Sequence, residues 1–424
     1  MNVQESAPPQ SAWANPNFRN VWSALSVSLI GSQITSLAVP LLAALTLNAT
    51  PLQMGYLAAA ERFPSLLFSL FTGVWVDRIG RKRLLMIWMD VLRAVLLLSV
   101  PLAAILGVLT LPQLYVVAFL LGTLTVFFEV AHYAYVPVIL PDSQILDGNS
   151  KLQVSHSAAS SAGPGLGGLI VQWLTAPFAL IFDALTYLAS AFFLLRIRAE
   201  APPLRNFPPQ GVVKDVREGL SALLRQRLLG AWAMCGTAIV FFTGAFEAQY
   251  ILYATRELNL NAGWIGLIAA AGGVAALPAA FLTTRVAQWL PVGPTIILGT
   301  LVWVLSLLVV PLASGPLGVV VGVLALARVV SGLTFTVANV QQWSLRQIVT
   351  PEHLRGRVSA SNRFLIDGAQ ALGAVFGGVL ATGLGLRRSL ILLCIGGLLC
   401  FLPLFFAPIW KLRKMPESST VTAP

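Results

Sequence analysis

The eleven residues Gly73-Val-Trp-Val-Asp-Arg-Ile-Gly-Arg-Lys-Arg83 contain one acid and four bases, in a chain of which only 10% of the residues are charged. Long apolar runs flank this segment, from Leu57 to Val76 before it and from Leu84 to Leu106 after it. Charges concentrated between two apolar runs are typical of a loop that joins two membrane-spanning helices. The segment therefore predicts an integral membrane protein.

The composition of the whole chain points the same way, because 57% of its 424 residues are apolar, well above the usage of soluble domains. A helix needs about 20 mostly apolar residues to cross the hydrocarbon core of a bilayer. Continuous runs of that length favour helices over a β-barrel, whose strands alternate in polarity over about ten residues. The sequence predicts an all-α protein with the lipid bilayer as its partner and twelve spans, at residues 20–46, 53–77, 84–107, 113–138, 150–174, 177–196, 229–253, 262–285, 293–312, 316–344, 358–384 and 388–410.

The distribution of bases predicts the orientation in the membrane, since Lys and Arg near the ends of spans stay on the cytoplasmic side. Twenty-one bases fall on the side of both termini and three on the other side, namely Arg256, Arg387 and Arg388. Both termini are therefore expected in the cytoplasm of a cell with this chain in its inner (plasma) membrane. The net charge of +11 suits a basic face against anionic lipid headgroups, so no nucleic acid is expected as a partner.

The chain also contains an internal repeat. Gly163-Pro-Gly-Leu-Gly-Gly168 in the fifth expected span recurs 210 residues later as Gly373-Ala-Val-Phe-Gly-Gly378 in the eleventh. At the same offset, Pro141-Asp142 and Pro351-Glu352 open the turns after the fourth and tenth spans. Transporters are commonly built from repeated bundles related by symmetry, so the sequence predicts two six-helix bundles.

This repeat sets the expected domain organisation. Pro202-Pro203 and Pro208-Pro209 mark a linker between the bundles. In the segment that follows, residues 212–227, the apolar side chains share one helical face. Such a pattern predicts an amphipathic helix on the inner membrane surface. The expected segments are an N-terminal tail at 1–19, a first bundle at 20–198, the linker at 199–228, a second bundle at 229–410 and a C-terminal tail at 411–424.

The quoted loop, placed between the second and third of twelve spans, resembles the signature loop of the major facilitator superfamily. The matching residues are Gly73, Asp77, Arg78, Gly80, Arg81 and Lys82. Gly163-Pro164-x-x-Gly167-Gly168 is similar to the motif associated with antiporters of that superfamily. The stretches 351–358 and 183–190 resemble a subgroup that contains macrolide-efflux proteins, siderophore exporters and a lysophospholipid flippase. The resemblance covers nearly the whole chain.

The resemblance implies alternating access by rocking of the two halves, with the charged loop as a gate. Asp77 would accept hydrogen bonds from the open N-terminus of the eleventh span, near 359–362, where the helix dipole also favours an anion. In the alternative interpretation the bases of the loop are only topology anchors, which leaves Asp77 without a purpose. Gly163 and Pro164 would bend the fifth span and let another backbone come close, for gating or for static packing.

The resemblance further implies that the first, fourth, seventh and tenth spans line a central cavity. The candidates for cargo contact there are Gln33, His132, Phe242, Phe246, Arg328, Phe335 and Asn339. Ionisable residues inside a bilayer are costly and indicate function. Glu129, expected to be desolvated, is the first candidate for proton coupling, and Glu247 is the second. In the competing interpretation either carboxylate pairs with Arg328. Members often carry an Arg in the fourth span, which here offers only Glu129 and His132.

The other ionisable residues within spans have simpler expected roles. Asp90 and Arg93 are three residues apart on one helix and can neutralise each other. The same reasoning applies to Arg363 and Asp367, and Asp183 is expected to support packing. The role of Glu61 and Arg62 is left open.

These observations predict a secondary active transporter that exports a small amphipathic or apolar compound, such as a drug, siderophore or metabolite, in exchange for protons. A lysophospholipid flippase or a metabolite importer with the same fold is the alternative. No Gly-x-x-x-x-Gly-Lys-Ser/Thr loop indicates ATP as the energy source, and no Gly-x-Ser-x-Gly motif indicates an enzyme. The three histidines and three cysteines show no metal-site spacing. We expect a monomer without cofactor or metal.

Overall fold

The computed structural model describes residues 11–198, 227–350 and 355–402, and a few single positions: 221, 404, 410, 412 and 413. Within this part of the chain the secondary structure is helical, without strands. Most of the expected linker helix and the turn at 351–354 lie outside the described residues.

The described residues form twelve long helices in two sets of six. The first set follows a short 3-10 helix, η1 (Ala12–Ala14), and consists of α1 (Pro16–Leu41), extended by the π-helical turn η2 (Leu42–Thr46), α2 (Pro51–Ile79), α3 (Lys82–Ile105), α4 (Leu111–Ile139), α5 (Asp142–Leu174) and α6 (Ala176–Leu195). The second set consists of α8 (Arg227–Arg256), α9 (Ala262–Trp289), α10 (Val292–Leu312), α11 (Leu317–Val349), α12 (Arg355–Leu384) and α13 (Leu386–Leu399).

The expected spans and the helices agree closely, and the largest difference at a helix start is in α5. This helix begins at Asp142, eight residues before the expected position, because the mostly polar stretch 142–149 extends the helix beyond the apolar run. Among the described residues, nine helices are long and apolar enough to cross a membrane. The helices α2 and α5 are not among these nine. Charged residues such as Glu61 and Arg62 interrupt the apolar run of α2, and α5 carries many serines and glycines.

Local sequence signals fix the helix ends. Thr50 and Gln53 form a reciprocal capping box at the start of α2, which satisfies two otherwise unpaired backbone groups. Asn15 and Asn261 cap α1 and α9 with their side chains. Gly80 ends α2 at a φ of +67°, a conformation that glycine adopts without steric cost. This turn lets α3 fold back against α6 and α4.

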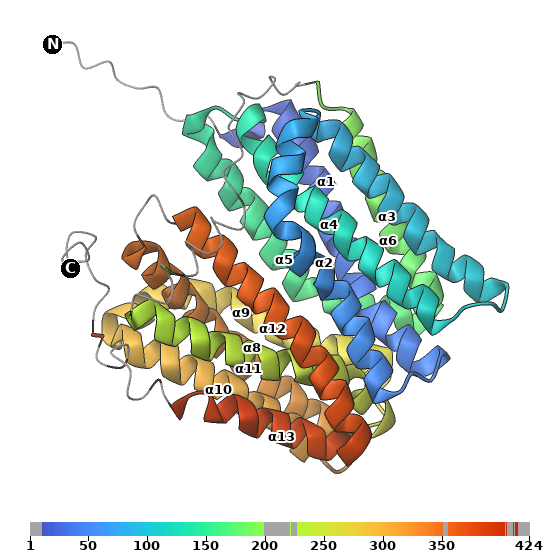
Figure 1. Cartoon of the computed structure of the whole chain (residues 1–424), viewed down its shortest axis with the longest axis vertical. Helices are drawn as coiled ribbons and strands as arrows, with labels where there is room; N and C mark the ends of the chain where they lie inside the picture. Colours follow the sequence, from blue (N-terminus) through green and yellow to red (C-terminus); the bar gives the residue numbers. More distant parts are fainter. Residues whose placement is uncertain are drawn as a thin grey trace.

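The two halves repeat the same helix pairing, which confirms the predicted fold of six helices plus six. In the first half α1 packs on α5 and α6, α2 on α4, and α3 on α4 and α6. In the second half α8 packs on α12 and α13, α9 on α11, and α10 on α11 and α13. Each helix of the first half thus corresponds to the helix of the second half whose label is seven higher, from α1 and α8 to α6 and α13. Figure 1 shows the first half at the upper right and the second half at the lower left.

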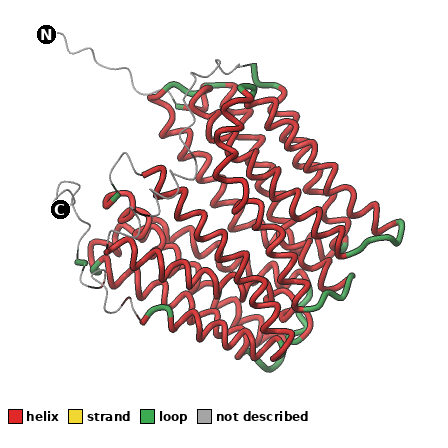
Figure 2. The backbone as a smooth tube through the Cα atoms, viewed as in Figure 1, coloured by secondary structure: helices red, strands yellow, loops and turns green. Residues whose placement is uncertain are grey.

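The helices run back and forth between two ends, with the short connections at these ends (Figure 2). We call the end at which α1, α3 and α5 begin the tail side and the opposite end the distal side. The halves join through two symmetric contacts, α2 with α12 and α5 with α9. Three hydrogen bonds between described residues also join the halves at the distal side: Arg256 to the carbonyl of Ala49, Gln249 to that of Pro51, and the Gly263 N–H to Gln172.

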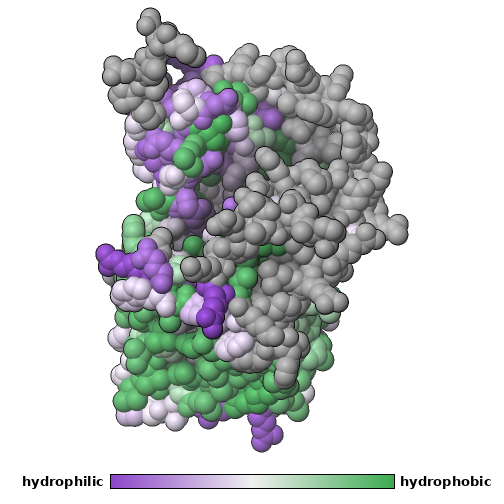
Figure 3. Space-filling view, turned by 90° about the vertical axis from the view of Figure 1, so that its left-hand side faces the viewer, coloured by the Kyte–Doolittle hydropathy of each residue, from purple (hydrophilic) through white to green (hydrophobic). Residues whose placement is uncertain are grey.

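The outer surface is suited to lipid. Large apolar side chains such as Phe281 and Leu326 point outward, 84% and 65% exposed, whereas the core clusters hold residues such as Tyr135 and Tyr253. Seen from the left-hand side of Figure 1, hydrophilic residues gather in the upper part of the molecule and hydrophobic residues cover the lower part, over the second half (Figure 3). In a bilayer this apolar surface would face the hydrocarbon.

Gly31 allows α1 to approach α6 closely, and its replacement should destabilise the fold. A Cβ at Gly31 would lie 2.0 Å from Thr186 Oγ1 and 2.2 Å from Asp183 Oδ1. Because overpacking costs about 1–3 kcal/mol and sometimes more, we expect Gly31→Val to lower the unfolding temperature in detergent clearly. Gly322→Val in α11, where the space is open, is the control and should leave that temperature nearly unchanged. Equal effects of the two changes would contradict the packing argument.

Candidate functional site

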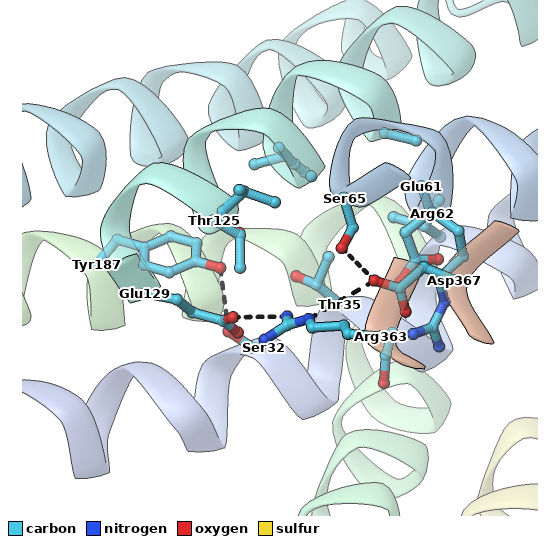
Figure 4. Close-up of a pocket in the computed structure, with 16 residues that line it drawn as sticks. Ser32, Thr35, Glu61, Arg62, Ser65, Thr125, Glu129, Tyr187, Arg363 and Asp367 are labelled. Carbon is cyan, nitrogen blue, oxygen red and sulfur yellow. Dashed lines mark hydrogen bonds and ion pairs between the residues drawn. The ribbon is translucent and has the colours of Figure 1, made fainter. Parts of the chain in front are cut away.

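Two adjacent cavities lie where the halves meet. The first has a volume of about 250 Å³ and lies among α1, α2, α4 and α6, with Arg363 and Asp367 of α12 contributed by the second half (Figure 4). The second, of about 300 Å³, is lined by residues of α1, α2, α5, α8, α9, α11 and α12. Both cavities are lined by Ser36, Glu61 and Arg62, so one polar tract crosses the boundary between the halves.

An ion pair bridges the halves at the first cavity. Arg363 Nη2 lies 3.0 Å from Glu129 Oε2, and Arg363 Nε lies 3.6 Å from Asp367 Oδ2. Ser65 of α2 donates a hydrogen bond to Asp367. Figure 4 shows these groups in a row from α4 through α12 to α2. The predicted Arg363–Asp367 pair is present, but it is part of a contact between the halves.

The surroundings of Glu129 differ from those expected. Its side chain is 41% exposed and that of Arg363 is 55% exposed, so the expected desolvation of Glu129 is wrong. The competing pairing with Arg328 is also wrong for Glu129, whose partner is Arg363. An ion pair this exposed contributes only about 0–1 kcal/mol. A single proton on Glu129 would therefore be enough to release Arg363.

The second cavity combines apolar walls with charged groups. Glu247 and Arg328 line it, and the Arg328 guanidinium lies 5.0 Å from the ring centroid of Tyr250. In the part of the chain that the structure describes, no hydrogen bond or ion pair is found for Glu61, Arg62 or Glu247. Charged groups that line a cavity without protein partners are available to a bound compound.

The other cargo candidates lie elsewhere. Gln33 packs against Gly163 at the contact of α1 with α5, and Phe242 lies against Gly396 of α13. Phe246 is 1% exposed and stacks on Tyr250, with ring centroids 6.3 Å apart. The ring centroid of Phe335 lies 4.7 Å from that of Trp303. His132 is buried and Asn339 is exposed. Their contact with cargo stays a prediction.

The repeated glycine motif holds α5 and α12 between the halves. A Cβ at Gly168 would lie 2.6 Å from the Ala262 carbonyl oxygen and 2.7 Å from Gly266 Cα, both in α9. The equivalent Gly378 in α12 would place a Cβ 2.9 Å from Leu52 Cα in α2. Gly167 faces α1 within its own half, where a Cβ at this position would lie 3.1 Å from Ile34 Cα. The last glycine of each motif therefore permits close contact with the opposite half.

The charged loop between α2 and α3 is described in part, because the side chains of Asp77 and Arg78 lie outside the described set. Lys82 is 5% exposed and donates a hydrogen bond of 3.3 Å to the Ala134 carbonyl of α4. Arg81 is exposed, and no atom lies within 4 Å of a Cβ built at Gly73. The predicted contact of Asp77 with the start of α12 stays a prediction.

Comparison with known proteins places this architecture in a family context. A family model described as Major Facilitator Superfamily matches residues 21–374. The "Multidrug efflux pump Tap" of Mycolicibacterium fortuitum is 26% identical over 404 residues, which cover 92% of this chain and 94% of that protein. The "Uncharacterized MFS-type transporter YfiS" of Bacillus subtilis (strain 168) is 26% identical over 401 residues, 92% of this chain and 93% of the relative.

Solved structures show the same fold at low sequence identity. A bacterial homolog to the human lysosomal transporter Spinster, in an inward-facing and unoccupied conformation, aligns with a TM-score of 0.72 at 11% identity. The alignment covers 94% of this chain and 98% of that one.

Proposed function

The chain belongs to the major facilitator superfamily, and we propose that it exports a small amphipathic compound from the cytoplasm in exchange for protons. The observation that carries this proposal is the Glu129–Arg363 pair, which joins the two halves beside a polar cavity. A titratable group on the contact between two moving bodies links protonation to the motion of those bodies. The family and its efflux relatives support the transport class.

The tail side is assigned to the cytoplasm. This assignment is supported by the excess of bases at this end, including Arg81, Lys82 and Arg83 between α2 and α3, because Lys and Arg near the ends of spans stay in the cytoplasm. The contacts through Gly168 and Gly378, and the hydrogen bond from Arg256 to Ala49, then join the halves on the outer side. Asp77 is proposed to close the inner side against the start of α12 when the cavity opens outward.

The coupling cycle follows from this assignment. When the cavity faces outward, a proton binds Glu129, and the neutral carboxyl group releases Arg363. When the cavity faces the cytoplasm, Glu129 loses the proton and the pair forms again. Because the pair contributes only about 0–1 kcal/mol, its formation and loss do not trap the transporter in one state. Arg363 also pairs with Asp367 of its own helix, which gives Arg363 a partner when Glu129 is neutral.

The cargo class follows from the second cavity. Apolar side chains such as Leu57 and Ile265 form part of its wall, beside Glu61, Arg62 and Arg328. An apolar wall with a few polar groups is typical of sites for small molecules that are partly apolar. Both halves of the cavity come from one chain, so a monomer is sufficient for transport.

The test is a comparison of compounds accumulated by everted vesicles with and without the protein, under an imposed gradient with an acidic lumen. In such vesicles export moves cargo into the lumen while protons leave it. We expect one or a few amphipathic compounds to accumulate only with the protein and only with the gradient. Accumulation of lysophospholipid alone would replace the proposed cargo, and loss of compounds from the lumen would indicate import.

A further inference from the structure

A buried polar cluster lies behind the wall of the first cavity, inside the first half. Its acids are Asp90 of α3 and Asp183 of α6, each 0% exposed, and its base is Arg93, which is 2% exposed. Tyr187 of α6, 4% exposed, completes it. The cluster is buried among α1, α3, α4 and α6, and its Tyr187 lines the first cavity together with Glu129 and Arg363.

One of the two acids is fully compensated. Asp90 Oδ1 accepts a hydrogen bond of 2.6 Å from Arg93 Nη2, and Asp90 Oδ2 accepts one of 2.6 Å from Ser190. The predicted Asp90–Arg93 pair is thus confirmed. The Arg93 guanidinium is also held between two rings, 4.3 Å from the centroid of Phe128 and 4.4 Å from that of Tyr187.

The second acid has only hydroxyl partners among the described residues. Thr35 of α1 donates a hydrogen bond to Asp183 Oδ2, and Thr186 donates one of 3.0 Å to Oδ1. Two acids share the single positive charge of Arg93, which is already paired with Asp90. An ionised Asp183 would therefore place an incompletely compensated charge inside the helix bundle, where a buried carboxylate neutralises instead.

Asp183 nevertheless has a route to the cavity. Thr35 lines the first cavity and contacts Asp183. Tyr187 and Ser32, whose hydroxyl groups lie 3.0 Å apart, also line that cavity. Asp183 is the eighth residue of α6, about 10 Å along the helix from its distal end at 1.5 Å per residue. A proton at this depth is inside the membrane but only one hydroxyl group away from cavity water.

From the charge count and this route, we propose that Asp183 is a second proton-binding site, which is occupied at neutral pH and exchanges its proton with the first cavity through Thr35. A proton from cavity water binds the Asp183 carboxylate to give the neutral acid, and the same proton returns to cavity water when the site empties. The charged and titratable groups that face Asp183 are Asp90 and Arg93 of α3 and Tyr187 of its own helix. From α1, Gly31 packs against Asp183 and the Thr35 hydroxyl donates a hydrogen bond to it. On α5, the charged residues Asp147 and Lys151 pair with each other near the tail-side end of that helix.

Proton occupancy of Asp183 does not depend on the proposed function, whereas a share in coupling does. Infrared spectroscopy of the purified protein at neutral pH measures occupancy directly, through the C=O stretch of a protonated carboxyl group. We expect such a band in the wild-type protein, a shift of the band when aspartate side chains carry ¹³C, and its loss in Asp183→Asn. Glu129→Gln is the control and should keep the band. A band that is insensitive to aspartate labelling, or unchanged in Asp183→Asn, would overturn the proposal.

A second variant tests the route and does not require Asp183→Asn to fold. Thr35→Val keeps the carboxyl group but removes the hydroxyl group between it and the cavity. We expect the band to remain and its exchange with deuterium to slow by about tenfold or more, since a positioned relay group accelerates proton transfer by at least that factor. Ser36→Ala, at a cavity residue whose hydroxyl donates to the Gln33 carbonyl, is the matched control and should exchange as the wild type does. Unchanged exchange in Thr35→Val would contradict the route through Thr35.

If the band behaves as expected but Asp183→Asn still drives full gradient-dependent transport, Asp183 binds a proton without taking part in coupling. If no compound is transported by the wild type, the proposed function fails while the occupancy of Asp183 stands on the infrared result. The two conclusions are therefore separable.

Discussion

Replacing Glu129 by glutamine should reduce cargo accumulation driven by a pH gradient by about tenfold for each pH unit at one proton per cargo molecule, because one unit corresponds to about 1.4 kcal/mol. Glutamine has the shape of the protonated side chain but cannot give up a proton. The bridge between Glu129 and Arg363, at 3.0 Å in the wild type, then loses its charge and its dependence on pH. Cargo binding and exchange without a gradient should survive, because Glu129 lines the first cavity whereas the cargo contacts proposed above lie in the second.

Glu247→Gln is the matched control, since this carboxyl group lines the second cavity and has no ion pair within the described chain. If Glu247 carries the coupling proton instead, the phenotypes of the two variants should be exchanged. Wild-type accumulation in Glu129→Gln would remove Glu129 from the coupling mechanism, and wild-type accumulation in both variants would argue against coupling through either group.

Gly168→Leu should shift the protein toward states that are open on the distal side. Its new side chain would collide with the α9 backbone at Ala262 and Gly266, a contact that exists only while the halves are closed there. An overpacking cost of about 1–3 kcal/mol, paid only in the closed state, changes the population ratio by about 5- to 150-fold. A cysteine at Ala269, which lines the second cavity, should then react faster with an impermeant reagent added on the distal side, once the native cysteines are replaced.

The internal symmetry of the chain supplies an independent version of this test. Gly378→Leu meets α2 at Leu52 and should have the same effect, whereas Gly322→Leu in open space should have none. If distal labelling is unchanged in both Gly168→Leu and Gly378→Leu, the glycine motif has a static packing role only.

Much of the fold could be predicted because the signals are local. The apolar runs gave the spans to within a few residues, apart from the start of α5, and the charged loop with Gly80 marked the turn between α2 and α3. Residues 405–409, just before the expected end of the last span, lie outside the described residues. The repeat of the Gly163 motif at Gly373 indicated two halves of six helices each. The early start of α5 was missed because a helix can continue through polar residues once it leaves the hydrocarbon.

The candidate site could be predicted less well because it depends on facing and on distant contacts. Glu129 and Arg363 are 234 residues apart, and no local pattern indicates that pair. Phe242 was expected to line the cavity, and its side chain lies against Gly396 of α13. Apolar residues occur on several faces of α8, so periodicity alone could not show which way the Phe242 side chain points. Glu61 and Arg62 carried the signal that could have placed them at the site, namely two adjacent charges within an apolar run.

Exchange of cargo for protons through Glu129 can be followed in the pH inside everted vesicles that are loaded with acid. Once a cargo is known, its addition outside should make the lumen pH rise faster than in vesicles without the protein, because each cargo molecule that enters lets protons leave. Vesicles with Glu129→Gln should show no such acceleration, while those with Gly322→Val, at a position in open space, should behave as the wild type does. Cargo uptake by the wild type with no change in lumen pH would contradict proton exchange, and an undiminished pH response in Glu129→Gln would contradict the role of Glu129.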